Sequence, residues 1–183
     1  TAGRVVAGYF AAFGNVDSDG DMIMPGAFKK SIEENGPGSA GNRKIAHLAH
    51  HDIRRMIGQL QQLKEDSQGL YFESKLGEHT DGDDALKMYQ SGIIKEHYIG
   101  FNYIGDKMRF IETDGADLDL DANSMAQIER RGGYWQVGEV KLWEGSYVTF
   151  GANQDTPSMG VIKSIDDRND RLKEINERME LLR

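Results

Sequence analysis

The pattern of apolar and polar positions along the chain predicts mainly short β-strands. Residues 5–13 combine β-branched, aromatic and small side chains without a charge, as a buried strand does. Shorter apolar or alternating runs predict further strands at 44–48, 57–63, 70–76, 98–104, 108–112 and 134–150. The run at 108–112 is expected to form a hairpin with 98–104, and 134–150 to form one long strand or two strands broken near Gly145.

Helical periodicity appears at two places in the body of the chain. Residues 27–34 place Phe28 and Ile32 on one face, which predicts a short helix. Residues 81–90 begin with capping residues and acidic side chains and end before Gly92, which predicts a second helix. The acidic stretch at 113–123 has no proline and is interpreted as a solvated surface insertion.

The end of the chain differs from the rest, because glycine disappears and charge dominates from residue 161 to 183. Heptad a and d positions predict an amphipathic helix, with Arg168 as the polar exception among Ile165, Leu172, Ile175, Met179 and Leu182. This helix either packs on the body of the protein or begins a coiled-coil scaffold segment of a longer parent. We therefore expect a β domain at 1–158 and a C-terminal helix at 159–183.

Composition limits the functional classes. A chain of 183 residues can bury a core in one domain, and the absence of cysteine excludes thiol chemistry and disulfides. Thirty acidic against 22 basic side chains give a net charge of −8, which argues against binding to nucleic acid or anionic lipid and favours protein partners. No apolar run reaches the roughly 18 to 20 residues that cross a bilayer. The cytoplasm is the expected compartment, and the start at Thr1 suggests a trimmed or processed fragment.

Two segments allow a metal interpretation. Residues 15–20 match the first half of a calcium-binding EF-hand loop, but Gly26 stands where the bidentate glutamate is required. His47 and His51 would share one face of a helix, yet the zinc motif's adjacent glutamate is absent and the neighbouring residues suit a strand end. We expect a structural acidic turn and no metal or other cofactor. The histidines suit acid–base chemistry better, and His51 is the candidate general base.

Four ordered blocks carry a resemblance to a known family. They lie at residues 14–28, 48–58, 97–101 and 142–153, and they resemble the signature blocks of the caudovirus prohead proteases. The resemblance extends from about residue 5 to about residue 157. It implies a mainly β fold with peripheral helices (α+β), an assemblin-like closed β-barrel plus the C-terminal helix. It also implies a serine endopeptidase that cleaves phage scaffold and major capsid proteins inside the assembling prohead, in the cytoplasm of the bacterial host, as a homodimer or higher oligomer.

The same resemblance implies a site. His51 takes the position of the catalytic histidine, Tyr98 the position of the nucleophilic serine, and Glu144 that of the carboxylate which orients the histidine. Backbone N–H groups near Ile99 and Gly100 would stabilise the oxyanion, since glycine allows close approach.

Tyr98 departs from the family pattern. Its hydroxyl stands at the end of a rigid ring, far from where a serine oxygen would be, and the ring fills the space of the scissile carbonyl. Ser91 lies beyond a glycine turn and Ser146 is interpreted as an ordinary strand residue, so neither is a good replacement. The simplest interpretation of Tyr98 is a strand aromatic residue that packs beside His51.

Two functions therefore compete. The first is a prohead maturation serine protease whose copy here is inactive because Tyr98 replaces the serine, and the second is a non-catalytic capsid assembly or scaffolding protein that keeps the protease fold. A metal-dependent hydrolase built on the histidine cluster is a third, less favoured class.

Overall fold

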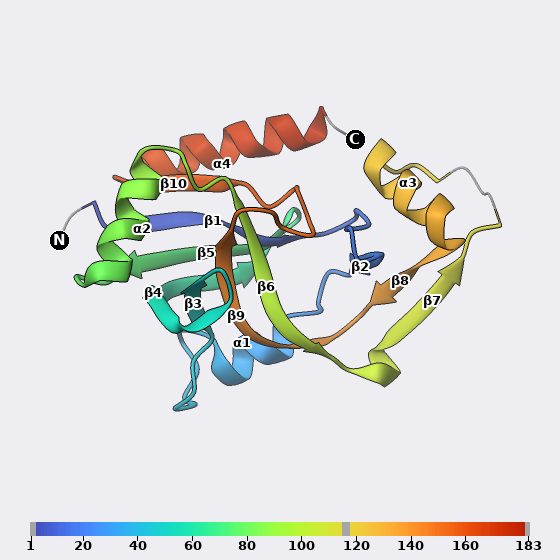
Figure 1. The fold of residues 1–183 in the computed structure, drawn as a ribbon, viewed down its shortest axis with the longest axis horizontal. Coiled ribbons are helices and arrows are strands. Elements are labelled where there is room, and N and C mark those ends of the chain that lie inside the picture. The colour runs from blue at the N-terminus through green and yellow to red at the C-terminus, as the bar shows by residue number, and fades with distance from the viewer. Residues whose placement is uncertain (1–2, 115–117, 182–183) are drawn as a thin grey trace.

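A computed structural model describes residues 3–114 and 118–181 of the chain, and its architecture is mainly β (Figure 1). A seven-stranded sheet has the strand order β10-β1-β5-β4-β3-β9-β6, and a three-stranded sheet has the order β2-β8-β7. The strands are β1 (Val5–Ala12), β2 (Asp21–Ile23), β3 (Ala46–Ala49), β4 (Asp52–Glu65), β5 (Gly69–Leu76), β6 (Glu96–Tyr103), β7 (Met108–Glu112), β8 (Gly133–Val137), β9 (Val140–Val148) and β10 (Ser158–Ile162). The helices are α1 (Lys29–Asn35), α2 (Thr80–Gln90), α3 (Ala122–Arg131) and α4 (Ile165–Glu180).

The large sheet curls so that its two edge strands approach each other (Figure 1). An isolated bridge between Glu96 and Pro157 joins the start of β6 to the segment before β10, next to a bond from the Ser158 N–H to the Lys95 carbonyl of 3.1 Å. Inside the curl, the rings of Phe10 and Phe72 stack with centroids 3.8 Å apart. The mainly β fold with peripheral helices is confirmed, although a single bridge rather than a continuous ladder closes the curled sheet.

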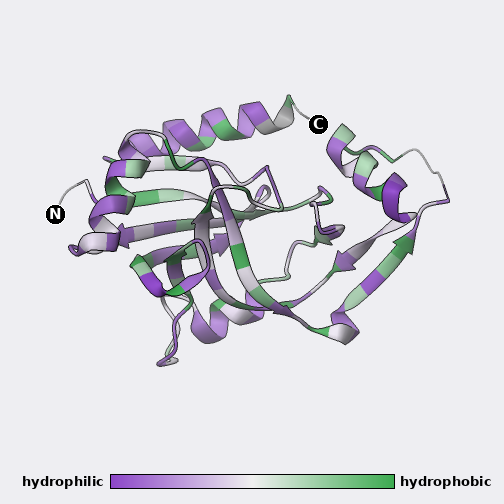
Figure 2. Cartoon of the chain, in the orientation of Figure 1, coloured by the Kyte–Doolittle hydropathy of each residue, from purple (hydrophilic) through white to green (hydrophobic). Residues whose placement is uncertain are grey.

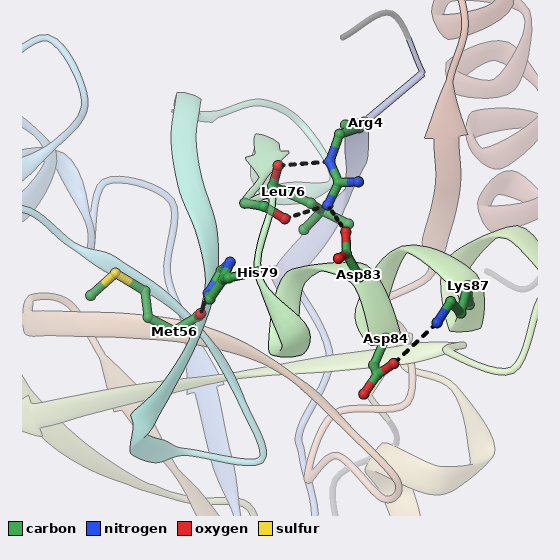
Figure 3. Close-up of polar contacts among 8 residues, drawn as sticks. Arg4, Met56, Leu76, His79, Asp83, Asp84 and Lys87 are labelled. Carbon is green, nitrogen blue, oxygen red and sulfur yellow. Dashed lines mark hydrogen bonds and ion pairs between the residues drawn. The ribbon is translucent and has the colours of Figure 1, made fainter.

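The helices cover the outside of the curled sheet (Figure 1). In that view α4 lies over β10 and β1, α1 lies on the opposite side, and α3 covers the small sheet. Figure 3 shows how α2 is held at one end: Arg4, just before β1, donates to the Leu76 carbonyl at 3.2 Å and pairs with Asp83 of α2 at 2.7 Å. Because α2 is anchored in this way, Tyr89 on its inner face is positioned against the core.

The C-terminal helix docks on its own sheet. Leu172 and Ile175 pack against the cluster formed by Ala7, Tyr9, Tyr71 and Met159, and Arg168 pairs with Glu73 at 3.1 Å. Its remaining surface is largely hydrophilic (Figure 2), and Ile165 is 68% exposed. Leu182 and the side chain of Met179 lie outside the described residues. No helix in the described part of the chain is long and apolar enough to cross a membrane.

Several predicted boundaries and pairings are wrong. β7 pairs with β8 and not with β6, whose partner is β9. The segment 134–150 breaks at residues 138–139, between two sheets, and not near Gly145, which lies within β9. Glycine is needed at this position because a side chain would collide with the Phe10 ring. Val161 belongs to β10 rather than to the terminal helix. β2, β10 and α3 were not predicted, and residues 115–117 of the acidic stretch lie outside the described residues.

Two histidines are part of the core. His47 lies edge-on to both Phe10 and Phe72, and neither of its ring nitrogens has a hydrogen-bond partner among the described residues. His97 Nε2 lies 2.9 Å from the Tyr89 hydroxyl. Burial lowers the pKa of His47 well below its ordinary value of 6.5 and lowers the pKa of His97 to about 4. Both imidazoles are therefore neutral near pH 7.

Acid should destabilise the fold through these two histidines. A buried imidazole takes up its proton on unfolding, so its contribution to stability is complete above about pH 6.5 and is lost as the pH falls toward the folded-state pKa. We expect His47→Leu to reduce the slope of unfolding free energy against pH by up to about 1.4 kcal/mol per pH unit, because it removes one proton uptake and breaks no hydrogen bond. Urea unfolding at a series of pH values measures this slope. An unchanged slope in His47→Leu would contradict the assignment.

Candidate functional site

A tight turn places His51 at the end of β3. His50 and His51 alone connect Ala49 to Asp52, which pair as neighbours in the β3–β4 hairpin. Both histidines have positive φ angles, 52° and 59°, as a two-residue type I′ hairpin turn requires. Glycine or asparagine is usual in such a turn, so this backbone is held by its surroundings. The His50 N–H donates to the Tyr147 carbonyl at 3.0 Å and the His51 N–H donates to Ser146 Oγ at 3.1 Å.

Strand β9 supplies the carboxylate. β9 runs parallel to β3, with Ala46 beside Glu144 and Leu48 beside Ser146, and the turn after Ala49 folds the chain back so that the His51 side chain reaches Glu144. His51 Nδ1 lies 2.6 Å from Glu144 Oε1, although the two residues are 93 positions apart in the chain. The Ser146 hydroxyl donates to the other carboxylate oxygen, Oε2, at 2.6 Å. Ser146 therefore fixes both the carboxylate and the histidine turn.

Tyr98 stands across from this pair on β6. It is paired with Ser146 in the β6–β9 ladder, and its ring lies edge-on to the His51 ring with centroids 6.0 Å apart. The hydroxyl points the other way, toward the β1–β2 loop, where it lies 3.3 Å from Asp17 Oδ2 and 3.3 Å from Asp19 Oδ2. Burial, reinforced by the charge of Asp17, raises the pKa of the Tyr98 phenol far above its usual value of 10. The phenol is therefore neutral and donates to carboxylates.

The acidic loop that receives the phenol is a structural turn. Asp17 Oδ1 accepts the backbone N–H groups of Asp19 and Asp21, both at 3.0 Å. Burial raises the pKa of Asp17 to about 6. The Tyr103 hydroxyl donates to the Asp21 carboxylate. Throughout residues 3–114 and 118–181, no three His, Asp or Glu side chains converge as a set of metal ligands.

The backbone of β6 comes very close to the carboxylate at Gly100. A side chain at this position would collide with Glu144 Oε1, so the position requires glycine. Gly100 pairs with Glu144 in the ladder, and the neighbouring Ile99 pairs with Gly145 and is buried. Both residues line the groove described in the next paragraph. The predicted role of their N–H groups requires a substrate oxyanion to lie in that groove.

A surface groove of about 780 Å³ contains the site. Its lining includes Asp19, His51, Ile53, Tyr98, Trp143 and Glu144. Hydrogen bonding to Glu144, opposed by partial burial, raises the pKa of His51 above 6.5. With Nδ1 engaged by the carboxylate, Nε2 is left to exchange a proton with a group in the groove. The arrangement supplies a histidine acid–base and its orienting carboxylate, but the residue at position 98 presents no attacking oxygen to the histidine.

The other sequence candidates do not line the groove. Ser91 Oγ donates to the Lys87 carbonyl at the end of α2, and Ser146 is fully buried. His47 is in the core and His51 lines the groove, so the two histidines of the zinc interpretation do not share a site. The role of Ser146 and the contact of Tyr98 with the acidic loop were not predicted from the sequence. The strand period of two could have placed Ser146 on the same face as Glu144.

Comparisons with known proteins agree with the resemblance seen in the sequence. The model of a family described as caudovirus prohead serine protease matches residues 1–171. The prohead protease of Enterobacteria phage HK97 is 29% identical over 164 residues, which cover 88% of this chain and 61% of that protein. The structure of varicella-zoster virus protease matches with a TM-score of 0.43 and 12% identity, covering 94% of this chain and 76% of the other. With the family model matching nearly all of its length, the chain belongs to the caudovirus prohead serine protease family.

Proposed function

We propose that this chain is a phage prohead maturation protease domain in which Tyr98 has replaced the nucleophilic serine, leaving the copy inactive. The observation that carries the proposal is the 2.6 Å contact between His51 Nδ1 and Glu144 Oε1 beside position 98. Family membership supports a peptide hydrolase. The chain spans only 61% of the length of the HK97 relative, so the activity and partners of the whole protein are part of the proposal.

The proposed mechanism assigns one role to each residue. A serine hydroxyl at position 98 would lose its proton to His51 Nε2 as it attacks a peptide carbonyl, and the imidazolium would return the proton to the leaving amine. Glu144 holds the tautomer and stabilises the imidazolium, while Ser146 holds Glu144. N–H groups at Ile99 and Gly100 would face the oxyanion.

Tyr98 does not take over the serine's role in this proposal. Its oxygen is shared between two carboxylates on the β1–β2 loop rather than directed at His51. Because the pKa of the phenol is raised, deprotonation near neutral pH is disfavoured. The substrates proposed are the scaffold and major capsid proteins, cleaved inside the assembling prohead in the host cytoplasm. A homodimer or higher oligomer remains part of the proposal.

The second candidate is a non-catalytic capsid assembly or scaffolding protein that keeps the protease fold. The contact of Tyr98 with Asp17 and Asp19 favours it, because the phenol has a structural role that a serine could not fill. A protein that has lost catalysis and kept a binding function would retain a side chain with such a structural role. The following experiment separates the two functions.

Tyr98→Ser should restore cleavage if the site is a protease that lacks only its nucleophile. Overlapping peptides from the scaffold and major capsid proteins of the same phage serve as substrates, with mass spectrometry as the readout. We expect turnover about 10³-fold or more above the matched control Tyr98→Ala, which loses the same phenol without adding an alcohol. Adding His51→Ala to Tyr98→Ser should abolish the gain. Equal, background turnover in both Tyr98 variants, with both shown to be folded by circular dichroism, would favour the assembly protein.

Glu144→Gln should lower the pKa of His51, since the hydrogen bond to the carboxylate is the main cause of the increase. The pKa is measured by NMR titration of the imidazole resonances, with His51→Gln used to identify the signal. Glu96→Gln is the matched control, because Glu96 lies on β6 and binds the Gly151 N–H instead of a histidine. A His51 pKa that is the same in Glu144→Gln and in the control would refute the pairing.

A further inference from the structure

Trp143 projects into the groove because of an irregularity in the ladder. The β6–β9 register shifts between Gly100, which pairs with Glu144, and Phe101, which pairs with Leu142, so Trp143 has no partner on β6. An extra residue of this kind forms a β-bulge and redirects its side chain. The indole N–H donates to the Asn102 side chain, and the ring lines the groove next to Glu144.

Two cations gather on this indole. The Arg43 guanidinium lies 5.6 Å from the ring centroid and the Lys141 ammonium lies 4.6 Å from it, both within cation–π range. Arg43 comes from the loop between α1 and β3, whereas Lys141 is on β9. Among the described residues, no carboxylate lies within ion-pair distance of either cation. Two like charges thus share one ring in a protein whose net charge is −8.

An anion at this place would be attracted by both cations. A polyanion fits poorly, because Asp19 and Glu144 line the same groove and would repel a row of negative charges. A single carboxylate meets less repulsion, since Glu144 is already engaged by His51 and Ser146. The groove also presents apolar surface for the rest of a peptide, with Ile53 84% exposed and Tyr103 48% exposed.

We propose that Trp143, which lines the groove, and the two cations on its ring, Arg43 and Lys141, which lie outside the groove lining, form a subsite for an acidic side chain of an extended peptide bound in the groove. This inference rests on the proposed function, since it takes the groove to be the place where a polypeptide substrate or former substrate lies. It adds a determinant of sequence preference that is separate from the His51–Glu144 pair. At one position of the bound peptide, glutamate or aspartate binds more tightly than the corresponding neutral amide, glutamine or asparagine.

The protein with Tyr98 in place allows the test to be made at equilibrium, because bound peptide is not consumed. Trp135→Phe leaves Trp143 as the sole indole, since the chain has two tryptophans. The probes are octapeptides of alanine and threonine in which one glutamate is moved through the eight positions, together with a matched glutamine series. Indole fluorescence reports the Kd of each peptide. We expect one glutamate register to bind about fivefold tighter than its glutamine counterpart, with the preference reduced at high salt.

Charge variants identify the source of the preference. Arg43→Gln with Lys141→Gln should abolish it, and Arg43→Glu with Lys141→Glu should favour a matched lysine series. Lys64→Gln is the matched control, because Lys64 also lies over an aromatic ring, but that ring is Tyr71, whose centroid is 5.2 Å away, and not Trp143. Equal binding of the glutamate and glutamine series, or a preference that survives the double neutral variant, overturns the subsite alone. Absence of binding by every peptide, together with no cleavage by Tyr98→Ser, overturns the proposed function as well.

Discussion

The site depends on the register of β9 between its two neighbours. β9 pairs in parallel with β3 and antiparallel with β6, so one strand brings Glu144 and Ser146 to the turn after β3 on one side and to position 98 on the other. Alternate residues of a strand point to opposite faces, so a slip of one residue would turn Glu144 away from His51 in the β3–β9 ladder, or away from the side chain at position 98 in the β6–β9 ladder. Any side chain at the position of Gly100 would collide with Glu144. A slip that placed another residue of β6 opposite Glu144 is therefore disfavoured. The geometry of the His51–Glu144 pair is thus a consequence of backbone pairing over the whole length of β9.

Tyr98 connects this ladder to the acidic loop. The loop residue Asp17 already accepts two backbone N–H groups, and the phenol adds a donor to its buried carboxylate. A buried carboxylate without donors is costly, so the tyrosine contributes to the order of the loop. A shorter side chain at position 98 would leave Asp17 and Asp19 without this donor. The proposed chemistry at His51 requires a short alcohol side chain at position 98, whereas the order of the loop requires the longer tyrosine.

Local sequence patterns were sufficient to predict most of the helices and strands, but not which strands pair with one another. The apolar run that became β1 and the capped segment that became α2 were predicted because burial and capping follow local periodicity. The pairing of β7 with β8 instead of β6 depends on contacts between distant segments, which periodicity does not encode. α3 was hidden because its N-cap, Asp121, looked like one more acid of a surface insertion. The proximity of His51, Glu144 and position 98 was expected from the family resemblance alone, and the ladder supplies its physical cause.

The histidines of this fold differ in the protonation state that their surroundings favour. His51 is partly exposed beside a carboxylate that favours its charged form, whereas burial favours the neutral forms of His47 and His97. The two effects on stability have opposite signs: that of His51 is present at low pH and fades as the pH rises through its raised pKa, while that of the core pair fades as the pH falls below 6.5. Solvent screening weakens the first, because the His51 side chain is 39% exposed, so the core pair dominates the acid response. The groove therefore favours the charged form of His51, while the core keeps its two imidazoles neutral.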